Sequence, residues 1–386
     1  MKLLKKVLIV FVSLILILEI YLLVSGNWHV NRVLAMTIFR GKTGPDIFEL
    51  QDFPSRKIPS GNPQSWPKSS KYGKVQPSSE LLSASAGYQT TALCMIQNDS
   101  LVYEEYWEGT NEHSLSNSFS MAKSFTSILI GIALKDGLIK SLDEPVGNYI
   151  EEFKAEAYKN ITIKHLLWMG SGLDFHESYG SPIGWPAKAY YGTDVNATVL
   201  KPDVSQKTGT HYNYKGGDTQ LLGIIIKKVT GKNVAEYASE KLWKKIGAED
   251  DSYWSLDTEN GMEKVSCCYY ASARDFARFG SLFLKKGNWN GEQIVDSSYV
   301  ESSIKPSPLV KQNETPVDNY GYQWWIANYK GEQIFYARGI LGQYIFAIPS
   351  KNIIMVRLGH KRAPKSGDEL PQDGYTYLDM AYELAN

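Results

Sequence analysis

The stretch NSFSMAKSFTSILIGIALKDG, residues 117 to 137, begins with small polar residues and continues as an almost entirely apolar run. From Phe125 to Leu134 apolar residues occupy nearly every side of a helix, which is typical of a helix buried in the middle of a fold. The first turn of such a helix ends inside the protein or at the floor of a cleft. Ser120 and Lys123 occupy this turn and, being three residues apart, lie on one face of it.

The Ser120 and Lys123 pair has the composition of a nucleophile beside a general base. Burial disfavours the charged form of a lysine, and a neutral amine can take the proton of a neighbouring hydroxyl. The helix N-terminus also presents free N–H groups and the positive end of the helix dipole to an oxyanion. One helical turn thus offers nucleophile, base and one oxyanion donor. The alternative is structural: a helix cap followed by a lysine that reaches solvent.

The same serine-to-lysine spacing occurs twice more, at residues 65–68 and 302–305. The first of these lies in a Pro-rich stretch, the second lies beside a proline, and neither heads an apolar helix. The helix context, rather than the spacing, therefore selects Ser120 and Lys123.

Composition excludes several classes of function. The chain of 386 residues has 41 Lys plus Arg and 41 Asp plus Glu, so its formal net charge is zero and no basic excess attracts a nucleic acid. The histidines are scattered and form neither a Ser-His-Asp triad nor a zinc motif; they are His29, His113, His165, His176, His211 and His360. We therefore expect no nucleic-acid partner, no metal and no cofactor.

The three cysteines, Cys94, Cys267 and Cys268, do not have the spacing of a disulfide framework or of a metal site. Their number is odd and two of them are adjacent. We expect buried thiols that pack as small hydrophobic groups.

Residues 1–26, MKLLKKVLIVFVSLILILEIYLLVSG, predict a membrane anchor. Three lysines precede a mostly apolar run from Val7 to Gly26, and about 20 residues at a rise of 1.5 Å cross a hydrocarbon core of about 30 Å. The run is longer than a usual secretory signal and lacks an A-x-A-like cleavage site. We expect the lysines to stay in the cytoplasm and the rest of the chain to lie outside. A cleaved signal peptide, and hence a secreted protein, is the alternative.

The remaining chain divides into a Pro/Ser/Gly-rich tether, residues 27–88, which we expect to wrap onto the domain, and one domain, residues 89–386. Alternating apolar runs predict strands at both ends of this domain, and the middle, about residues 138 to 310, is mostly helical. The simplest packing pairs the N-terminal and C-terminal strands in one antiparallel sheet beside a helical lobe, an α+β fold. The helix of Ser120 then lies at the junction.

Several motifs in order carry a family resemblance. SMAKSFTSILIGIALKDGLI, LDEPVGNYI, ITIKHLLWMGSGLDF and TGTHYNYKGGDTQLLGIIIKKVTG resemble the serine β-lactamase and penicillin-binding-protein family, nearest its class C-like esterases and 6-aminohexanoate-dimer hydrolases. The similarity covers roughly residues 88 to 385. It implies a helical lobe against a lobe with an antiparallel sheet, and acyl transfer through an acyl-serine. In this pattern Ser120 matches the nucleophile and Lys123 its lysine partner.

The second motif of the family, Y-x-N, is incomplete. Counting back from Leu221 places Tyr214 at the tyrosine and Gly216 where asparagine is expected; an alternative register uses Tyr212 but fits the following residues less well. By resemblance Tyr214 helps protonate the leaving group, a role open to a phenol.

The third motif, usually K-T-G or H-x-G, is degenerate in FYARGILGQYIFAIP. The resemblance to the aminohexanoate group implies that the strand end at Gly339 and the backbone N–H of Ile340 complete the oxyanion hole. Arg338 is a candidate partner for a substrate carboxylate, with a surface salt bridge as the alternative. The missing Asn and Lys argue against efficient β-lactamase activity.

The sequence therefore predicts a membrane-anchored serine hydrolase for esters or amides, with Ser120, Lys123 and Tyr214 as catalytic residues. One alternative is a β-lactamase or D-alanyl-D-alanine carboxypeptidase, and another is a non-hydrolytic sensor of the cell envelope. An aromatic stretch is a candidate lid over the cleft, or else part of a core; its members are Tyr179, Trp185, Tyr190 and Tyr191.

Overall fold

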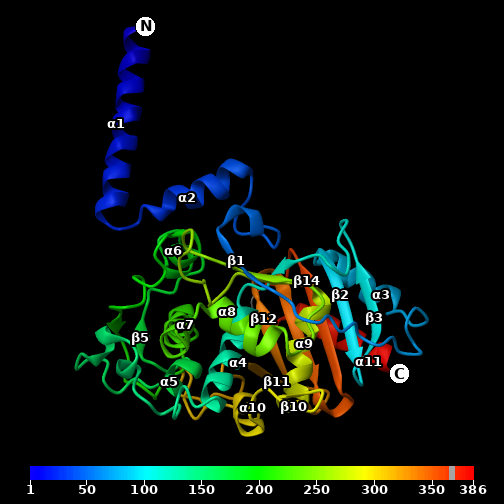
Figure 1. The fold of residues 1–386 in the computed structure, drawn as a ribbon. Coiled ribbons are helices and arrows are strands. Elements are labelled where there is room, and N and C mark those ends of the chain that lie inside the picture. The colour runs from blue at the N-terminus through cyan, green and yellow to red at the C-terminus, as the bar shows by residue number, and fades with distance from the viewer. Residues whose placement is uncertain (365–369) are drawn as a thin grey trace.

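One lobe is built on a six-stranded antiparallel sheet (Figure 1), as seen in the computed structural model, which describes residues 1–364 and 370–386. Its strands are β2 (Thr90–Gln97), β3 (Ser100–Tyr106), β11 (Trp325–Tyr329), β12 (Glu332–Gly339), β13 (Gln343–Ile348) and β14 (Ile353–Gly359). Their order is β11-β12-β13-β14-β2-β3, and β14 pairs antiparallel with β2. The prediction that strands from both ends of the chain share one sheet is confirmed.

Helices cover both faces of this sheet, and the strands alternate accordingly. Ile354 and Val356 of β14 belong to the core formed with α9 (Ala273–Leu284), while Ile353 and Met355 belong to the core formed with α11 (Gln372–Ala385). A third helix, α3 (Ser79–Gly87), lies beside α11. Because both faces are buried, β13 and β14 read as continuous apolar runs in the sequence.

The second lobe is helical and surrounds α4 (Met121–Lys135), in which every residue from Met121 to Ala133 is buried. This helix packs on α7 (Gly216–Thr230) on one side and on β12 and β13 on the other. The prediction of a buried helix at the junction of the two lobes is therefore confirmed. The other helices of this part are short; they are α5 (Ile163–Leu167), α6 (Trp185–Tyr191), α8 (Val234–Ala238), a π-turn (Ser239–Trp243) and α10 (Ser297–Ser303).

A small sheet of order β1-β7-β8-β4 joins distant segments next to the start of α4. Its strands are β1 (Ser55–Ile58), β7 (Ser252–Ser255), β8 (Tyr269–Ala271) and β4 (Ser116–Asn117). Strand β4 ends shortly before Ser120, and β8 follows the two adjacent cysteines. Two further pairs of short strands are β5 (Leu173–Asp174) with β6 (Asp203–Val204) and β9 (Asn288–Trp289) with β10 (Glu292–Gln293).

The N-terminal helix α1 (Lys2–Val24) projects away from the body (Figure 1), and Leu22 is its only buried residue. It is long and apolar enough to cross a membrane. The next helix, α2 (His29–Met36), contacts α6. The His29 Nε2 atom is 3.0 Å from the carbonyl oxygen of Pro182, which lies just before α6. Asn31 donates a hydrogen bond to Glu19 of α1. Residues 27–88 run over the body and contribute β1 and α3 to it.

Candidate active site

Ser120 and Lys123 meet at the first turn of α4. Ser120 is the N-cap residue of the helix, and the Lys123 Nζ atom lies 3.1 Å from the Ser120 Oγ atom. The lysine side chain is only 3% exposed. The structure thus brings together the two residues that the sequence places in the roles of nucleophile and base.

The second hydrogen-bond partner of Lys123 is a main-chain carbonyl group. The Lys123 amine donates a hydrogen bond of 2.8 Å to the Ser266 oxygen. One turn further along α4, the Thr126 hydroxyl donates to the neighbouring Val265 oxygen at 2.9 Å. The loop before β8 therefore lies against the start of α4 through two consecutive carbonyl groups, and one of them orients the amine toward Ser120.

The chain enters α4 through an unusual backbone conformation at Phe119, whose φ is +43°. Residues other than glycine rarely adopt positive φ, and such conformations persist only where surrounding contacts impose them. Here the Asn117 Oδ1 atom accepts a hydrogen bond of 2.9 Å from the Phe119 N–H, and the Asn117 amide group bonds the hydroxyls of Tyr190 and Tyr270. This turn presents Ser120 at the pocket.

Tyr214 lies beside Lys123. The Lys123 Nζ atom is 5.2 Å from the centre of the Tyr214 ring, which packs on Trp325 with the ring centres 5.4 Å apart. Tyr212, the alternative from the other register, is buried and packs on Tyr320 instead. The register that uses Tyr214 places the tyrosine next to Lys123.

The structure explains why position 216 is glycine. A Cβ atom there would lie 2.3 Å from the ring of Trp185, so an asparagine side chain does not fit. The Gly216 N–H group instead donates a hydrogen bond of 2.8 Å to the Glu177 carboxylate. Trp185 and Glu177 together fill the space that the family motif gives to the asparagine.

The end of β12 approaches the start of α4 closely. A Cβ atom at Gly339 would lie 2.3 Å from the Ser118 oxygen, so only glycine allows this approach. Ile340 follows at the edge of the pocket. The side chain of Gln343 holds the turn, because it donates to the Gly359 oxygen at 2.6 Å and accepts from the Gly359 N–H at 3.2 Å. This arrangement brings Ile340 to the rim of the pocket that also contains Ser120.

Arg338 does not line the pocket. Its guanidinium lies 3.5 Å from the centre of the Trp325 ring, a stacked cation–π contact. Trp325 in turn packs on Tyr214. Arg338 is therefore linked to Lys123 only through the rings of Trp325 and Tyr214, and its charge is directed over an aromatic ring.

A pocket of about 140 Å³ opens beside Ser120. Most of its wall is apolar or aromatic, and the residues of α6 form a large part of it. The polar residues in the wall are Ser120, Lys123, Glu177 and Ser266. The aromatic stretch suggested as a lid does lie here, since its four members all line the pocket: Tyr179, Trp185, Tyr190 and Tyr191.

The tether, residues 27–88, packs against the outside of this pocket. Pro45 lines it directly. Met36, Ile47 and Phe53 form an apolar cluster with Phe119 and with the two tyrosines at the end of α6, Tyr190 and Tyr191. Residues 27–53 thus support Phe119, the residue that precedes Ser120.

Glu177 and Tyr179 are site residues that the sequence did not assign a chemical role. The Tyr179 hydroxyl donates a hydrogen bond of 3.0 Å to Glu177, and it also interacts with the Ser120 hydroxyl. Burial raises the pKa of the Glu177 carboxyl, while the charge of Lys123 opposes this rise. Its Oε2 atom is buried and has no hydrogen-bond partner among the described residues. No spacing rule could have found this carboxylate, because it comes from a loop that is distant from α4 in the sequence and reaches Ser120 only in the folded chain.

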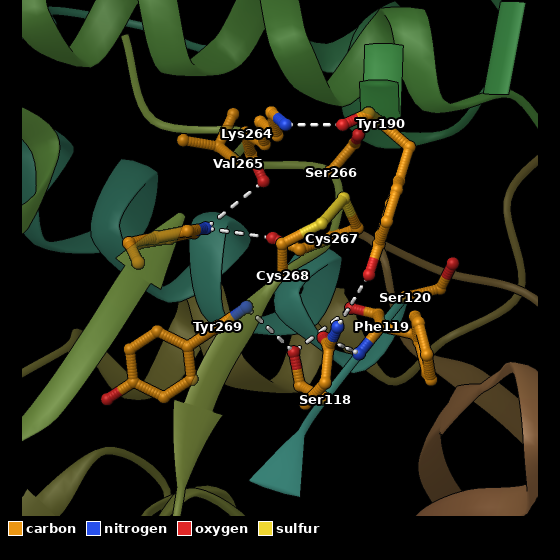
Figure 2. Close-up of a disulfide and its surroundings, with 12 residues drawn as sticks. Ser118, Phe119, Ser120, Tyr190, Lys264, Val265, Ser266, Cys267, Cys268 and Tyr269 are labelled. Atoms are coloured by element: carbon orange, nitrogen blue, oxygen red, sulfur yellow. Dashed lines mark hydrogen bonds between the residues drawn. A yellow bond between two sulfur atoms is a disulfide. The ribbon is translucent and has the colours of Figure 1, made fainter. Parts of the chain in front are cut away.

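The expectation for the cysteines is wrong at two of three positions. Cys94 is a free, buried thiol, as predicted, but Cys267 and Cys268 form a disulfide with each other (Figure 2). Neighbouring cysteines in a regular strand point to opposite faces and cannot bond. Here the chain turns sharply before β8, with Cys268 at a φ of +66°, and this turn brings the two sulfur atoms together. Cys267 is part of the pocket wall.

Residues 1–364 and 370–386 contain no group of three or more His, Cys, Asp or Glu side chains that could hold a metal ion.

Comparison with known proteins identifies the family. The Beta-lactamase family model matches residues 79–373. The chain belongs to the β-lactamase family. This family consists of serine hydrolases, so the predicted resemblance, fold and enzyme class are confirmed.

Several members of the family are similar to this chain. The chain is 25% identical to the 6-aminohexanoate-dimer hydrolase of Paenarthrobacter ureafaciens over 292 residues, 70% of this chain and 72% of that one. A solved structure from Bacillus anthracis, provisionally named a 6-aminohexanoate-dimer hydrolase, is 26% identical and superposes with a TM-score of 0.72 over 86% of this chain and 90% of its own. A family VIII carboxylesterase shares the fold, with a TM-score of 0.64 and 16% identity over 83% of this chain and 99% of its own.

Proposed function

We propose that this member of the β-lactamase family hydrolyses esters or amides of small apolar acyl groups through an acyl-enzyme at Ser120. One observation carries the proposal: a buried lysine amine lies 3.1 Å from a serine hydroxyl at the floor of an apolar pocket. Nucleophile and base within hydrogen-bond reach, with the base oriented by a third group, are the geometric signature of covalent catalysis.

In the proposed reaction Ser120 attacks the acyl carbon while Lys123 takes the hydroxyl proton. The negative charge that develops on the acyl oxygen is met by N–H groups at the start of α4 and at Ile340. Tyr214 then helps to pass a proton to the leaving group, which departs as an alcohol or amine. Water attacks the acyl-serine in the second half, and the same groups act in reverse.

The pocket limits the acyl group. A dry cavity of about 150 Å³ accommodates a benzene-sized molecule, so the 140 Å³ beside Ser120 suits a group of about six carbon atoms. Its aromatic wall favours an apolar chain over a charged one. Short-chain acyl esters are therefore the appropriate first substrates.

Efficient hydrolysis of β-lactams is disfavoured. The family uses an asparagine in the second motif to hold the β-lactam amide, and Trp185 blocks that position here. The usual lysine of the third motif is also missing from residues 335–343. An ester lacks the groups that these two side chains would bind, so its hydrolysis is less affected.

The proposal places the enzyme at a membrane. Helix α1 has a length and hydropathy suited to an anchor, and three lysines precede its apolar run. In this arrangement the hydrolase body lies outside the cytoplasm. Full-length protein should stay in the membrane pellet after carbonate extraction and keep its N-terminus, whereas a cleaved signal would release a chain that begins near residue 27.

The hydrolysis proposal is tested with the soluble chain, residues 27–386, and p-nitrophenyl esters of two to eight carbon atoms. We expect a burst of one equivalent of nitrophenol, then steady turnover, with the highest kcat/KM at or below about six carbons. A stable acyl adduct without turnover would support the non-hydrolytic sensor instead. Faster turnover of a penicillin than of any ester would support the β-lactamase or carboxypeptidase.

A further inference from the structure

The bond between Cys267 and Cys268 lies in the loop that touches the catalytic lysine. Ser266, whose oxygen accepts the hydrogen bond from Lys123, directly precedes the disulfide. Cys267 itself lines the acyl pocket, and Figure 2 shows the disulfide in the same region as Tyr190 and the Ser118–Ser120 segment. The disulfide is therefore next in sequence to the residue that contacts Lys123, and it belongs to the wall of the same pocket.

The backbone of this loop is held by several partners at once. The Trp254 indole N–H donates to the Lys264 oxygen at 3.1 Å and to the Cys267 oxygen at 2.9 Å. The Cys268 oxygen accepts from the Ser255 N–H at 3.0 Å. With these contacts on either side, the covalent ring of two adjacent cysteines removes the remaining rotational freedom at the residues that follow Ser266.

The direction of the Ser266 carbonyl decides what the lysine can do. One N–H of the Lys123 amine is committed to the Ser266 oxygen, so the amine keeps a fixed rotation with its Nζ atom 3.1 Å from the Ser120 hydroxyl. To act as a base, an amine must direct its lone pair at the hydroxyl. A shift of this carbonyl would turn the amine away from the hydroxyl.

We propose that the Cys267–Cys268 disulfide is a positioning element of the active site, which holds the Ser266 carbonyl so that the Lys123 amine faces Ser120. This inference rests on the proposed function and adds to it a dependence on the oxidised state of the loop. An oxidising compartment outside the cytoplasm preserves such a bond. A dithiol reverses it: the S–S bond breaks, two protein thiols form, and the reagent closes its own disulfide.

Without the bond, nothing covalent holds Cys268 at its φ of +66°, a conformation that is unfavourable for residues other than glycine. The loop then relaxes and the Ser266 oxygen moves. Because a displacement of about 1 Å in a catalytic constellation can lower the rate 100-fold, we expect kcat to fall about 10- to 100-fold on reduction.

The test compares four full-length proteins in a mild detergent, with and without dithiothreitol: the parent, Cys267→Ser, the double variant Cys267→Ser/Cys268→Ser, and Cys94→Ser. We expect the parent to lose kcat on reduction and to regain it on reoxidation, with little change in KM. Both variants that lack the bond should have the low kcat in either condition. Cys94→Ser is the matched control, since its thiol is buried in β2, and it should respond to reduction as the parent does.

Two further measurements separate positioning from simple loss of folding. Reduction should lower the rate constant for labelling of Ser120 by a fluorophosphonate, whereas a smaller fraction of folded enzyme would lower the labelled fraction and leave the rate constant unchanged. The melting temperature of the reduced protein should show that it is still folded at the assay temperature. Free thiols at both positions in the untreated protein, or a kcat unchanged by reduction, would overturn the inference. Absence of Ser120 labelling in the oxidised parent would instead overturn the proposed function.

Discussion

Tyr214 and Lys123 contact each other through the face of the phenol ring, at 5.2 Å from the Nζ atom to the ring centre. If Tyr214 helps to protonate the leaving group, Tyr214→Phe keeps this packing but removes the proton. We expect kcat for an ester to fall about 100-fold or more, the usual effect of losing a general acid–base group. Steady-state kinetics measure it, and Tyr212→Phe, the alternative register, serves as the control. An unchanged rate for Tyr214→Phe, or a loss only for Tyr212→Phe, would reject the assignment.

Position 216 tests the departure from the family motif. In Gly216→Asn the new side chain meets the Trp185 ring, and overpacking of this kind costs about 1–3 kcal/mol of folding free energy. We expect a lower Tm and no gain in penicillin hydrolysis. Gly87→Ala is the matched control, because a Cβ atom at this helical glycine has nothing within 4 Å. A Gly216→Asn variant as stable as the parent would show that Trp185 does not limit this position.

At the scale of elements, the tether meets the loop before β8 at Lys264. This lysine is buried, bonds the Tyr190 carbonyl and lies 4.2 Å from the centre of the Phe53 ring. Burial, with help from Arg32, lowers the pKa of its amine to about 7, and Asp257 only partly opposes this. Between about pH 7 and pH 10.5 the unfolded chain therefore binds a proton that the folded protein does not.

The free energy of unfolding should consequently rise with pH across this window, because the penalty of the buried charge is complete below about pH 7 and has disappeared only above about pH 10.5. In Lys264→Met this rise is lost. The difference in the free energy of unfolding between variant and parent should therefore favour the variant most at pH 6 and shrink toward pH 10. The expected size is a few kcal/mol, on the order of 1.4 kcal/mol for each pKa unit. Urea unfolding at several pH values measures it, with exposed Lys201→Met as the control. Parallel curves for Lys264→Met and the parent would contradict the prediction.

The elements also show what a sequence can and cannot reveal. Ser120 and Lys123 are predictable because their contact is local: three residues on one helix fix it. The shared sheet follows from strand patterns at both ends of the chain. The Ser266 contact is not predictable, since any residue offers a main-chain oxygen and only the fold brings this one to the lysine. The adjacency of Cys267 and Cys268 was the only sequence signal for the disulfide. The bond also requires the turn with Cys268 at positive φ, which the sequence pattern does not predict.

At the scale of the whole molecule, residues 27–58 are part of the catalytic body rather than a passive linker. Pro45 lines the pocket, and β1 pairs with β7 in register from Ser55 to Ile58. Arg56 of this strand forms an ion pair with Glu263, a side chain with no exposed surface. Removal of one partner of a buried pair costs about 3–5 kcal/mol.

A chain of residues 27–386 should therefore keep the fold and the esterase activity, whereas a chain of residues 59–386 should lose both. The point variant Arg56→Ala should lower the free energy of unfolding by about 3 kcal/mol without removing the strand. Thermal and urea unfolding, run beside ester hydrolysis, measure these effects. If the chain that begins at residue 59 unfolded and turned over as the longer chain does, the segment would be a tether only.

The central claim is that Ser120 is a nucleophile activated by Lys123, and intact-mass spectrometry after a fluorophosphonate probe tests it most directly. The parent chain of residues 27–386 should gain one adduct, located by peptide mapping at Ser120. Ser120→Ala should gain none, and Lys123→Ala should label at least about 100-fold more slowly. Labelling that persists in Ser120→Ala would contradict the account.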